Sequence, residues 1–344
     1  MTEDADILFE VADGLGVVTL NRPAALNALT TDMILRFHAQ LRAWATDPAV
    51  RRVAVRGAGE KGFCAGGDIR ALYDGRGTAV TADFFREEYR LNRAIFHYPK
   101  PYIALMDGIT MGGGVGVSVH ARHRVVSEAT MLAMPETGIG LFPDVGATYF
   151  LPRMPGRLDA FMALTGARLK AADCLYGGIA DVFVPSARHD ALIAALRGDT
   201  DIEAVLRSFA AEAGAAPLAV HRAAIDRCFA GDTVEAIEAA LAREDTDWAK
   251  AQRGVMAGKS PTSQKIALRQ VQIGGSFAFD DCMRLEYRLS QHCMAGHDFF
   301  EGVRAVVIDK DQAPQWRPAR LDQVSDAAVE EYFAPLAAAA LTFD

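Results

Sequence analysis

Short runs of β-branched residues alternate with amphipathic segments along the first half of this 344-residue chain. The segments 32–44 and 82–96 have the apolar spacing of helices, and the short runs between such segments have the composition of buried strands. Strands of only three or four residues argue against a barrel of long strands. They favour a fold in which many short strands stack with crossover helices. We therefore predict an α/β fold, with strands at residues 17–20, 53–55, 102–105 and 124–126.

The strand pattern fades after about Val184. Residues 190–294 are rich in Ala, Leu, Glu and Arg at helical spacing. We therefore predict an α/β core over residues 1–190, followed by a mostly helical C-terminal region over residues 191–344 that covers the core or mediates assembly.

Composition and charge restrict the class of partner. Apolar residues make up 51% of the chain, enough for a sizeable core, and the formal net charge of -8 is spread without a block of five like charges. Such a chain has no electrostatic footprint for DNA, RNA or anionic lipid. We expect a small-molecule partner, with no nucleic acid and no membrane.

The cysteines and the N-terminus bear on the cellular compartment. Five cysteines lie far apart and never as Cys-x-x-Cys, which argues against a disulfide framework and a zinc site and favours a reducing compartment. His120 and His123 have no further ligand cluster with them, so we expect no metal. Residues 2–6 are acidic where a targeting segment would be basic, and no apolar run of about 18 residues is present, so we expect a cytoplasmic protein.

A glycine cluster at residues 112–116 follows an expected strand and opens an apparent helix at residues 115–120. It lacks the Gly-Lys-Ser/Thr ending of a Walker loop and the Gly-x-Gly-x-x-Gly spacing of a dinucleotide site. Two interpretations remain. The glycines allow a strand to pack closely on a helix, or they leave backbone N–H groups free to stabilise an oxyanion.

A second glycine-rich turn at residues 62–69 favours the oxyanion interpretation. It also follows an expected strand and precedes an apparent helix, with Asp68 placed as the N-cap. An oxyanion hole for a thioester needs two converging donors, each contributing on the order of 3 kcal/mol of transition-state stabilisation. Cys64 in this turn has no neighbouring His, so we expect it to be a small buried residue rather than a nucleophile.

Two acids follow the glycine cluster in apolar surroundings, Glu136 after Pro135 and Asp144 after Pro143. Partial desolvation would raise the pKa of Glu136 toward the working pH of a general base or acid. A loop that returns Asp144 to the same pocket would let the two carboxylates divide these roles. The alternative for each acid is a solvated turn residue, but their joint position after two oxyanion-type turns favours catalysis.

The order of these motifs resembles the enoyl-CoA hydratase/isomerase (crotonase) superfamily and, within it, the 3-hydroxyisobutyryl-CoA hydrolase family most closely. The resemblance covers nearly the whole chain and includes the helical second half. The matching segments include Asn21-Arg22-Pro23, Leu26-Asn27-Ala28-Leu29, Ala65-Gly66-Gly67-Asp68, Met111-Gly112-Gly113-Gly114, Met134-Pro135-Glu136-Thr137, Phe142-Pro143-Asp144-Val145, Ser260-Pro261-Thr262-Ser263, Glu286-Tyr287-Arg288-Leu289-Ser290 and Phe300-Glu301-Gly302-Val303.

The resemblance implies a crotonase-like, acyl-CoA-binding core of stacked ββα repeats, and it assigns roles to individual residues. The backbone N–H groups of Gly67 and Gly113 would form the oxyanion hole, and Glu136 would be the principal catalytic acid with Asp144 beside it. Glu88 would contact the substrate, although its helical setting fits a surface ion pair equally well. The residues near the adenine end of coenzyme A would be Ala65, Asp68 and Ile69.

The implied activity is hydrolysis of a short 3-hydroxyacyl-CoA thioester, 3-hydroxyisobutyryl-CoA above all, in valine catabolism. Hydratases of the superfamily carry their first catalytic glutamate three residues after the oxyanion glycine, where this chain has Gly116. Hydratase or isomerase activity is therefore the weaker alternative. A non-catalytic acyl-CoA-binding protein is a third, against which Glu136 and Asp144 both argue.

The resemblance also bears on cofactors and assembly. No cofactor is expected, because coenzyme A is part of the substrate. The sequence itself is silent on oligomeric state, but the superfamily often forms trimers and hexamers, so the resemblance suggests a homo-oligomer. The candidates for contacts with the phosphates of coenzyme A, each equally compatible with a solvated surface charge, are Arg22, Lys61, Arg70 and Lys100.

Overall fold

The computed structural model describes residues 5–336 and 340–343, and the chain forms two compact units. Unit 1 comprises Met1–Asp68, Arg90–Ala133 and Arg168–Ala219, and unit 2 comprises Ile69–Tyr89, Met134–Ala167 and Val220–Asp344. The units therefore interleave along the sequence, whereas a functional division after residue 190 remains a prediction. Residues 2–4 of the acidic N-terminal stretch lie outside the described residues.

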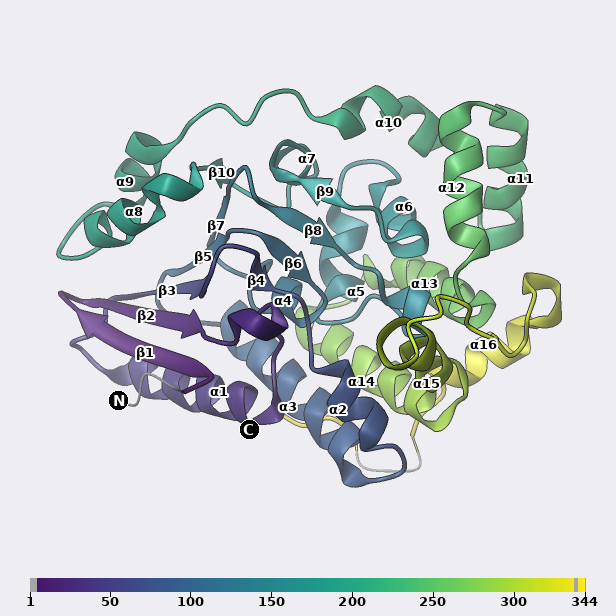
Figure 1. The fold of residues 1–344 in the computed structure, drawn as a ribbon, viewed down its shortest axis with the longest axis horizontal. Helices are drawn as coiled ribbons and strands as arrows, with labels where there is room; N and C mark the ends of the chain where they lie inside the picture. The colour runs from purple at the N-terminus through teal and green to yellow at the C-terminus, as the bar shows by residue number, and fades with distance from the viewer. Residues whose placement is uncertain (1–4, 337–339, 344) are drawn as a thin grey trace. The chain divides into compact units, whose positions relative to one another are not determined.

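Unit 1 contains two β-sheets (Figure 1). The larger sheet has the order β1-β2-β3-β5-β7-β10, in which β1 and β2 are antiparallel and the other neighbours are parallel. Its strands are β1 (Ile7–Ala12), β2 (Leu15–Leu20), β3 (Arg52–Gly57), β5 (Tyr102–Met106), β7 (His123–Val126) and β10 (Val182–Phe183). The smaller sheet has the order β4-β6-β8-β9, with β4 (Gly62–Cys64), β6 (Ile109–Met111), β8 (Met131–Ala133) and β9 (Leu169–Lys170).

The chain passes between the two sheets in a regular way. β4 follows β3, β6 follows β5 and β8 follows β7, so each repeat places one strand in each sheet before the next helical segment. At the corner between β5 and β6, Gly108 has φ +95° and a Cβ atom there would lie 2.8 Å from the carbonyl oxygen of Lys61, so the corner needs glycine. The predicted α/β stack of short strands is confirmed, and the four expected strands are parts of β2, β3, β5 and β7.

The larger sheet packs against helices of its own unit. The core there combines strand residues such as Val17 and Leu105 with helix residues such as Leu192 and Leu206. Each such side chain contributes about 1.5–3 kcal/mol when fully buried. The helical segments of unit 1 are η1 (Pro23–Ala25), α1 (Thr31–Thr46), α4 (Gly113–Gly116), α7 (Ala171–Tyr176), η4 (Ser186–Arg188), α8 (His189–Ala195) and α9 (Ile202–Phe209).

The helix expected at residues 115–120 is shorter than predicted, because α4 ends at Gly116. The Ser118 hydroxyl donates to the carbonyl oxygen of Gly114 at 2.7 Å, and the Ser118 N–H donates to Val115 instead. A serine hydroxyl that takes the carbonyl four residues back competes with helix propagation. The apolar spacing of the segment did not reveal this competition.

Unit 2 is mostly helical. α3 (Ala79–Phe96) and α10 (Pro217–Cys228) each run from one unit into the other. Figure 1 shows α11 (Val234–Glu244) and α12 (Asp247–Ala257) side by side as a helical pair. The other helical segments of unit 2 are α2 (Ile69–Asp74), η2 (Glu136–Ile139), α5 (Ala147–Phe150), η3 (Leu151–Arg153), α6 (Leu158–Thr165), α13 (Pro261–Gly274), α14 (Phe279–Ala295), α15 (Asp298–Val303), η5 (Arg304–Ile308), η6 (Leu321–Gln323) and α16 (Asp326–Phe333).

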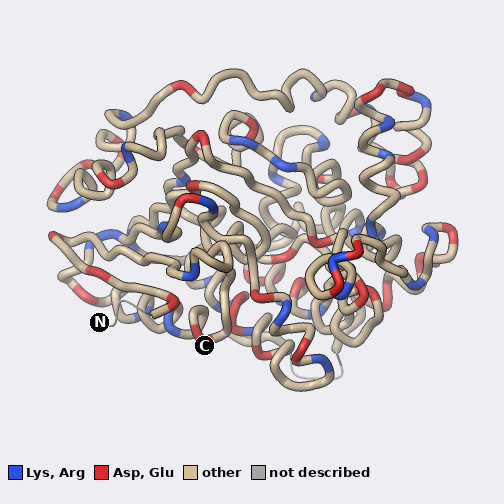
Figure 2. The backbone as a smooth tube through the Cα atoms, viewed as in Figure 1, with Lys and Arg blue, Asp and Glu red and all other residues tan. Residues whose placement is uncertain are grey.

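Charged residues of both signs are interspersed along the backbone of each unit (Figure 2). Over residues 5–336 and 340–343, none of the helices has the length and apolarity needed to cross a membrane. Within the same ranges, no group of three or more His, Cys, Asp and Glu side chains is arranged to hold a metal ion. All five cysteines are buried, and none of them forms a disulfide bond within the described residues.

Candidate active site

Unit 2 contains four buried carboxylates that influence one another's protonation, Glu88, Glu136, Asp144 and Glu286, which we call the carboxylate cluster. Their exposed fractions are 2%, 4%, 4% and 0% in that order. Burial is the main cause that raises the pKa of each, because it disfavours the charged form. Asp144 and Glu286, with pKa values of about 7 and about 8, can take up and release protons near neutral pH, as general acid–base catalysis requires.

Glu136 begins η2, directly after Pro135 at the N-cap. Its Oε2 atom is buried and has no hydrogen-bond partner within the described part of the chain. Burial, followed by the charge of Asp144, holds its pKa well above the usual value, and the charge of Lys259 opposes this shift. An unpaired buried carboxylate oxygen costs folding free energy, so it indicates a functional group rather than a turn residue.

Asp144 lies in the loop that leads from η2 into α5. The loop turns at Gly140, where φ is +71° and a Cβ atom would lie 2.2 Å from the backbone of Asp298. The Tyr89 hydroxyl donates to Asp144 Oδ2 at 2.8 Å. Burial raises the pKa of Asp144 to about 7, and the hydrogen bond from Tyr89 opposes this rise. The structure thus brings Glu136 and Asp144 into one cluster.

Glu88 precedes Tyr89 on α3. Its Oε1 atom is buried and lacks a hydrogen-bond partner among the residues that the structure describes. Burial and then the charges of Asp144, Glu136 and Glu286 raise its pKa well above the usual value. Its burial excludes the surface ion pair that was the alternative for this position.

Glu286, on α14, completes the cluster and was missed as a site residue in the sequence. Burial raises its pKa to about 8. Its two carboxylate oxygens accept the backbone N–H groups of Gly146 at 2.7 Å and Thr148 at 2.8 Å. A signal was available, because Glu286 shares the buried face of an amphipathic helix with Cys282 and Leu289, and a glutamate on such a face needs a partner.

Unit 1 brings the two glycine-rich turns together. A Cβ atom at Gly66 would lie 3.7 Å from the backbone nitrogen of Gly113, and one at Gly114 would lie 2.1 Å from the carbonyl oxygen of Cys64. The second approach leaves no room for a side chain. Within residues 5–336 and 340–343, the backbone N–H groups of Gly67 and Gly113 donate no hydrogen bond. Two free donors on adjacent turns can serve an oxyanion.

The residues expected near coenzyme A lie at the first of these turns. Ala65, Gly67 and Asp68 are partly exposed, and Asp68 pairs with Arg22 at 3.2 Å. Ile69 is also partly exposed, begins α2 and belongs to unit 2.

Lys100, one of the candidate phosphate ligands, has a structural role. Its ammonium group donates to the carbonyl oxygens of Trp44, Asp47 and Val50 at the end of α1. An ammonium has only three N–H donors, so these bonds leave none for a phosphate. Arg22 is also engaged, since it donates to the carbonyl oxygen of Ala28 at 2.7 Å.

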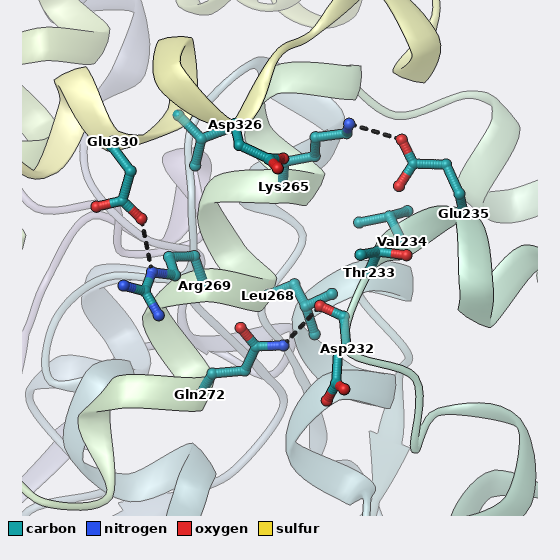
Figure 3. Close-up of a pocket in the computed structure, with 11 residues that line it drawn as sticks. Asp232, Thr233, Val234, Glu235, Lys265, Leu268, Arg269, Gln272, Asp326 and Glu330 are labelled. Atoms are coloured by element: carbon teal, nitrogen blue, oxygen red, sulfur yellow. Dashed lines mark hydrogen bonds and ion pairs between the residues drawn. The ribbon is translucent and has the colours of Figure 1, made fainter.

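A polar cavity of about 280 Å³ is bordered by α11, α13 and α16 in unit 2, and none of its lining residues belongs to the carboxylate cluster (Figure 3). Lys265 pairs with Glu235 at 2.6 Å, and Arg269 pairs with Glu330 at 2.9 Å. Gln272 donates to the carbonyl oxygen of Asp232 at 2.9 Å. Because its two basic side chains already pair with glutamates, this cavity is a weaker candidate site than the cluster.

The sequence and fold match known proteins along nearly their whole length. The sequence model of a family described as enoyl-CoA hydratase/isomerase matches residues 15–333. The 3-hydroxyisobutyryl-CoA hydrolase, mitochondrial, of Gallus gallus is 47% identical over 344 residues, which is 96% of this chain and 89% of that protein. The protein of the same name from Homo sapiens is 46% identical over 350 residues, which is 98% of this chain and 91% of that protein.

Two solved structures share the fold over both halves of the sequence. A carnitinyl-CoA dehydratase from Mycobacterium thermoresistibile has a TM-score of 0.95 at 44% identity, over 99% of each chain. An enoyl-CoA hydratase from Rhodobacter sphaeroides 2.4.1 has a TM-score of 0.93 at 42% identity, over 98% of this chain and 100% of that one. The likeness includes the helical second half.

Proposed function

Because the chain belongs to the enoyl-CoA hydratase/isomerase family, we propose that it hydrolyses a short 3-hydroxyacyl-CoA thioester, 3-hydroxyisobutyryl-CoA above all. The products are 3-hydroxyisobutyrate and coenzyme A, in valine breakdown. The carboxylate cluster carries the proposal, because it supplies proton-transfer groups in a chain nearly half identical to hydrolases named for this substrate. Coenzyme A enters with the substrate, and the reaction needs no separate cofactor.

The backbone N–H groups of Gly67 and Gly113 polarise the thioester carbonyl. Its oxygen gains negative charge as the carbon becomes tetrahedral, and each donor then stabilises the transition state by about 3 kcal/mol. Their lack of any other acceptor within the described residues supports this role. Ala65, Asp68 and Ile69 contact the adenine end of coenzyme A.

Glu136 drives the attack by one of two routes. As a base it takes a proton from water, and the resulting hydroxide adds to the carbonyl carbon. As a nucleophile its carboxylate forms the new acyl–oxygen bond, and water then cleaves the mixed anhydride. The C–S bond breaks in both routes. A single turnover in ¹⁸O-labelled water tests the anhydride route: attack of water on the Glu136 carbonyl carbon of the anhydride leaves label in Glu136, whereas attack on the acyl carbon, in either route, labels only the released acid.

Asp144 and Glu88 complete the chemistry. With a pKa of about 7, Asp144 is available in both protonation states at neutral pH. It protonates the leaving thiolate, orients the attacking water or binds the 3-hydroxyl group of the substrate. Glu88 contacts the substrate, and its unpaired Oε1 atom can accept a hydrogen bond from that hydroxyl.

Hydration of an enoyl-CoA is the second candidate, favoured by the names of the two matching structures. Gly116 opposes it. This last residue of α4 has no side chain at the position where hydratases of the superfamily carry their first catalytic glutamate. Addition of water across a C=C bond would then lack one of its two carboxylates.

A thiol-release assay tests the proposal. Purified protein with 3-hydroxyisobutyryl-CoA should release free thiol, and Glu136→Gln should abolish release without abolishing binding. Glu244→Gln is a matched control in unit 2, because Glu244 pairs with Arg227 at 2.8 Å and does not belong to the carboxylate cluster. Release unaffected by Glu136→Gln would refute the assigned site, and loss of enoyl absorbance with crotonyl-CoA would favour the second candidate. Comparison with 3-hydroxypropionyl-CoA measures the contribution of one methyl group, about 1–3 kcal/mol.

We also propose a cytoplasmic protein that assembles as a trimer or hexamer. The vertebrate relatives are named mitochondrial, so fractionation of the source cells is the direct test of the compartment. Light scattering of the purified protein tests the assembly.

A further inference from the structure

We propose that Glu286 and Gln270 are positioning residues that hold residues 143–148, the Asp144 loop, in its active conformation. The inference rests on the proposed function, because it assigns Asp144 a part in thioester hydrolysis. The two side chains come from different helices, α14 and α13, and both are fully buried.

The Asp144 loop has a backbone conformation that it would not adopt alone. Val145 has φ +52°, in the left-handed region, and Gly146 follows with φ +95°. A β-branched side chain is rare at such an angle because its Cβ atom crowds the neighbouring carbonyl. A residue of this kind persists only where surrounding contacts determine its conformation.

Glu286 holds the loop on the C-terminal side of Val145. Its Oε2 accepts the N–H of Gly146 at 2.7 Å, and its Oε1 accepts the N–H of Thr148 at 2.8 Å. These N–H groups lie at the start of α5, where a helix has no carbonyl partners of its own for them. One carboxylate therefore fixes two backbone positions directly after the strained residue.

Gln270 holds the loop on both sides of Val145. Its Nε2 donates to the carbonyl oxygen of Pro143 at 2.7 Å and to Thr148 Oγ1 at 2.7 Å. Thr148 therefore contacts both positioning residues, through its hydroxyl oxygen to Gln270 and through its backbone N–H to Glu286. α13 lies directly against the loop, because a Cβ atom at Gly274 would be 2.1 Å from the carbonyl oxygen of Thr148.

These contacts place Asp144 between two anchored points. Pro143 before it and Gly146 after it are held by Gln270 and Glu286, and the Tyr89 hydroxyl binds its carboxylate. Burial of the Glu286 carboxylate costs folding free energy, which its two hydrogen bonds to the loop offset. Misplacing a catalytic group by about 1 Å can reduce the rate about 100-fold, so losing the contacts that Glu286 and Gln270 make with the loop should slow the reaction.

Two substitutions weaken or remove these contacts with the Asp144 loop without changing side-chain size much. Glu286→Gln leaves one oxygen to accept two N–H groups, and Gln270→Met removes both donors. We expect kcat for thiol release from 3-hydroxyisobutyryl-CoA to fall about 10–100-fold in each, with KM within about threefold of the wild-type value. The kcat–KM split distinguishes positioning from partial unfolding, which lowers the amount of active protein, so activity is normalised to the folded fraction by circular dichroism.

Matched controls remove similar hydrogen bonds elsewhere in unit 2. Gln272→Met, on the cavity-facing side of α13, removes a donor to the carbonyl oxygen of Asp232 (Figure 3). Asp226→Asn alters a carboxylate that accepts the backbone N–H of Arg157 at 2.8 Å. Both controls should keep kcat within about threefold of wild type.

A double-variant comparison tests action through Asp144. In an Asp144→Glu background, where the carboxylate is already displaced, Glu286→Gln should lower kcat much less than it does alone. The proposal is overturned if both folded single variants keep wild-type kcat, or if the loss is undiminished in that background. If Glu286→Gln does not fold, Gln270→Met decides the question in the same way. Absence of thiol release by the wild-type protein would instead refute the proposed function.

Discussion

Tyr89→Phe isolates one hydrogen bond in the carboxylate cluster. It removes the hydroxyl that donates to Asp144 Oδ2 at 2.8 Å and keeps the buried aromatic ring. A donor to a carboxylate favours its ionised form, so removal must raise the pKa of Asp144 above its value of about 7.

The size of the shift follows from the strength of the bond. A hydrogen bond to a charged group contributes about 1.5–3 kcal/mol, and 1.36 kcal/mol corresponds to one pKa unit, so the pKa should rise by about one to two units. If ionised Asp144 is required, activity at pH 7 should fall about 5–50-fold and return to within about twofold of wild type near pH 9.5. If protonated Asp144 is required, the alkaline limb should move to higher pH by the same amount.

The assay is the pH dependence of kcat/KM for thiol release, corrected for spontaneous hydrolysis at high pH. Tyr98→Phe is the matched control, because the Tyr98 hydroxyl donates to the carbonyl oxygen of Leu41 at 3.1 Å in unit 1. The control should leave both limbs of the profile unchanged. If both limbs of the Tyr89→Phe profile lie within about 0.3 units of wild type in folded protein, Asp144 does not titrate in the reaction and the reasoning is wrong.

Three further substitutions test other parts of the structure. Glu136→Gln should be as stable as wild type at pH 5 and more stable by about 0.5–2 kcal/mol at pH 9, as measured by urea unfolding. The reason is that the raised pKa of Glu136 makes the wild-type protein lose stability as pH rises. Equal stabilities at pH 9 would contradict a cost of burying the ionised Glu136. Gly114→Ala places a Cβ atom 2.1 Å from the carbonyl oxygen of Cys64, so it should cost about 1–3 kcal/mol of stability and displace both oxyanion turns. The control is Gly254→Ala, which has open space around it and should stabilise the protein by up to about 1 kcal/mol. Lys100→Met should lower the free energy of unfolding by about 1–3 kcal/mol and leave KM unchanged, since three carbonyl oxygens lose their donor; a raised KM at unchanged stability would restore Lys100 as a phosphate ligand.

The sequence was sufficient for the architecture because periodicity and glycine placement are local signals. Strands such as β2 and β5 could be recognised from their short β-branched runs. The two glycine-rich turns could be located by their positions after strands. The length of α4 could not be predicted, because it depends on which carbonyl the Ser118 hydroxyl takes. Apolar spacing carries no information on that choice.

The site was predicted in part. Glu136 and Asp144 stood out because apolar residues and prolines surround them in the sequence. The role of Glu88 could be decided only from its burial in the structure. Glu286 and Gln270 could be recognised only from their contacts with a loop that is far away in the sequence. The structural role of Lys100 was missed for a similar reason, because the carbonyl oxygens at the end of α1 that accept its hydrogen bonds are distant in sequence. Long-range partners of polar side chains are what a single sequence leaves undetermined.

The interleaving of the two units has a consequence for synthesis on the ribosome. Glu88 lies in the first stretch of unit 2 and Glu286 in the last. At a translation rate of about 5–20 residues per second, on the order of ten to forty seconds separate the emergence of these two residues. During that interval the apolar surfaces of α5 and α6 lack the contacts that α13 and α14 provide in the folded chain. The complete carboxylate cluster can therefore form only after Glu286 has emerged, and the interval before that is when the nascent chain depends most on protection from aggregation.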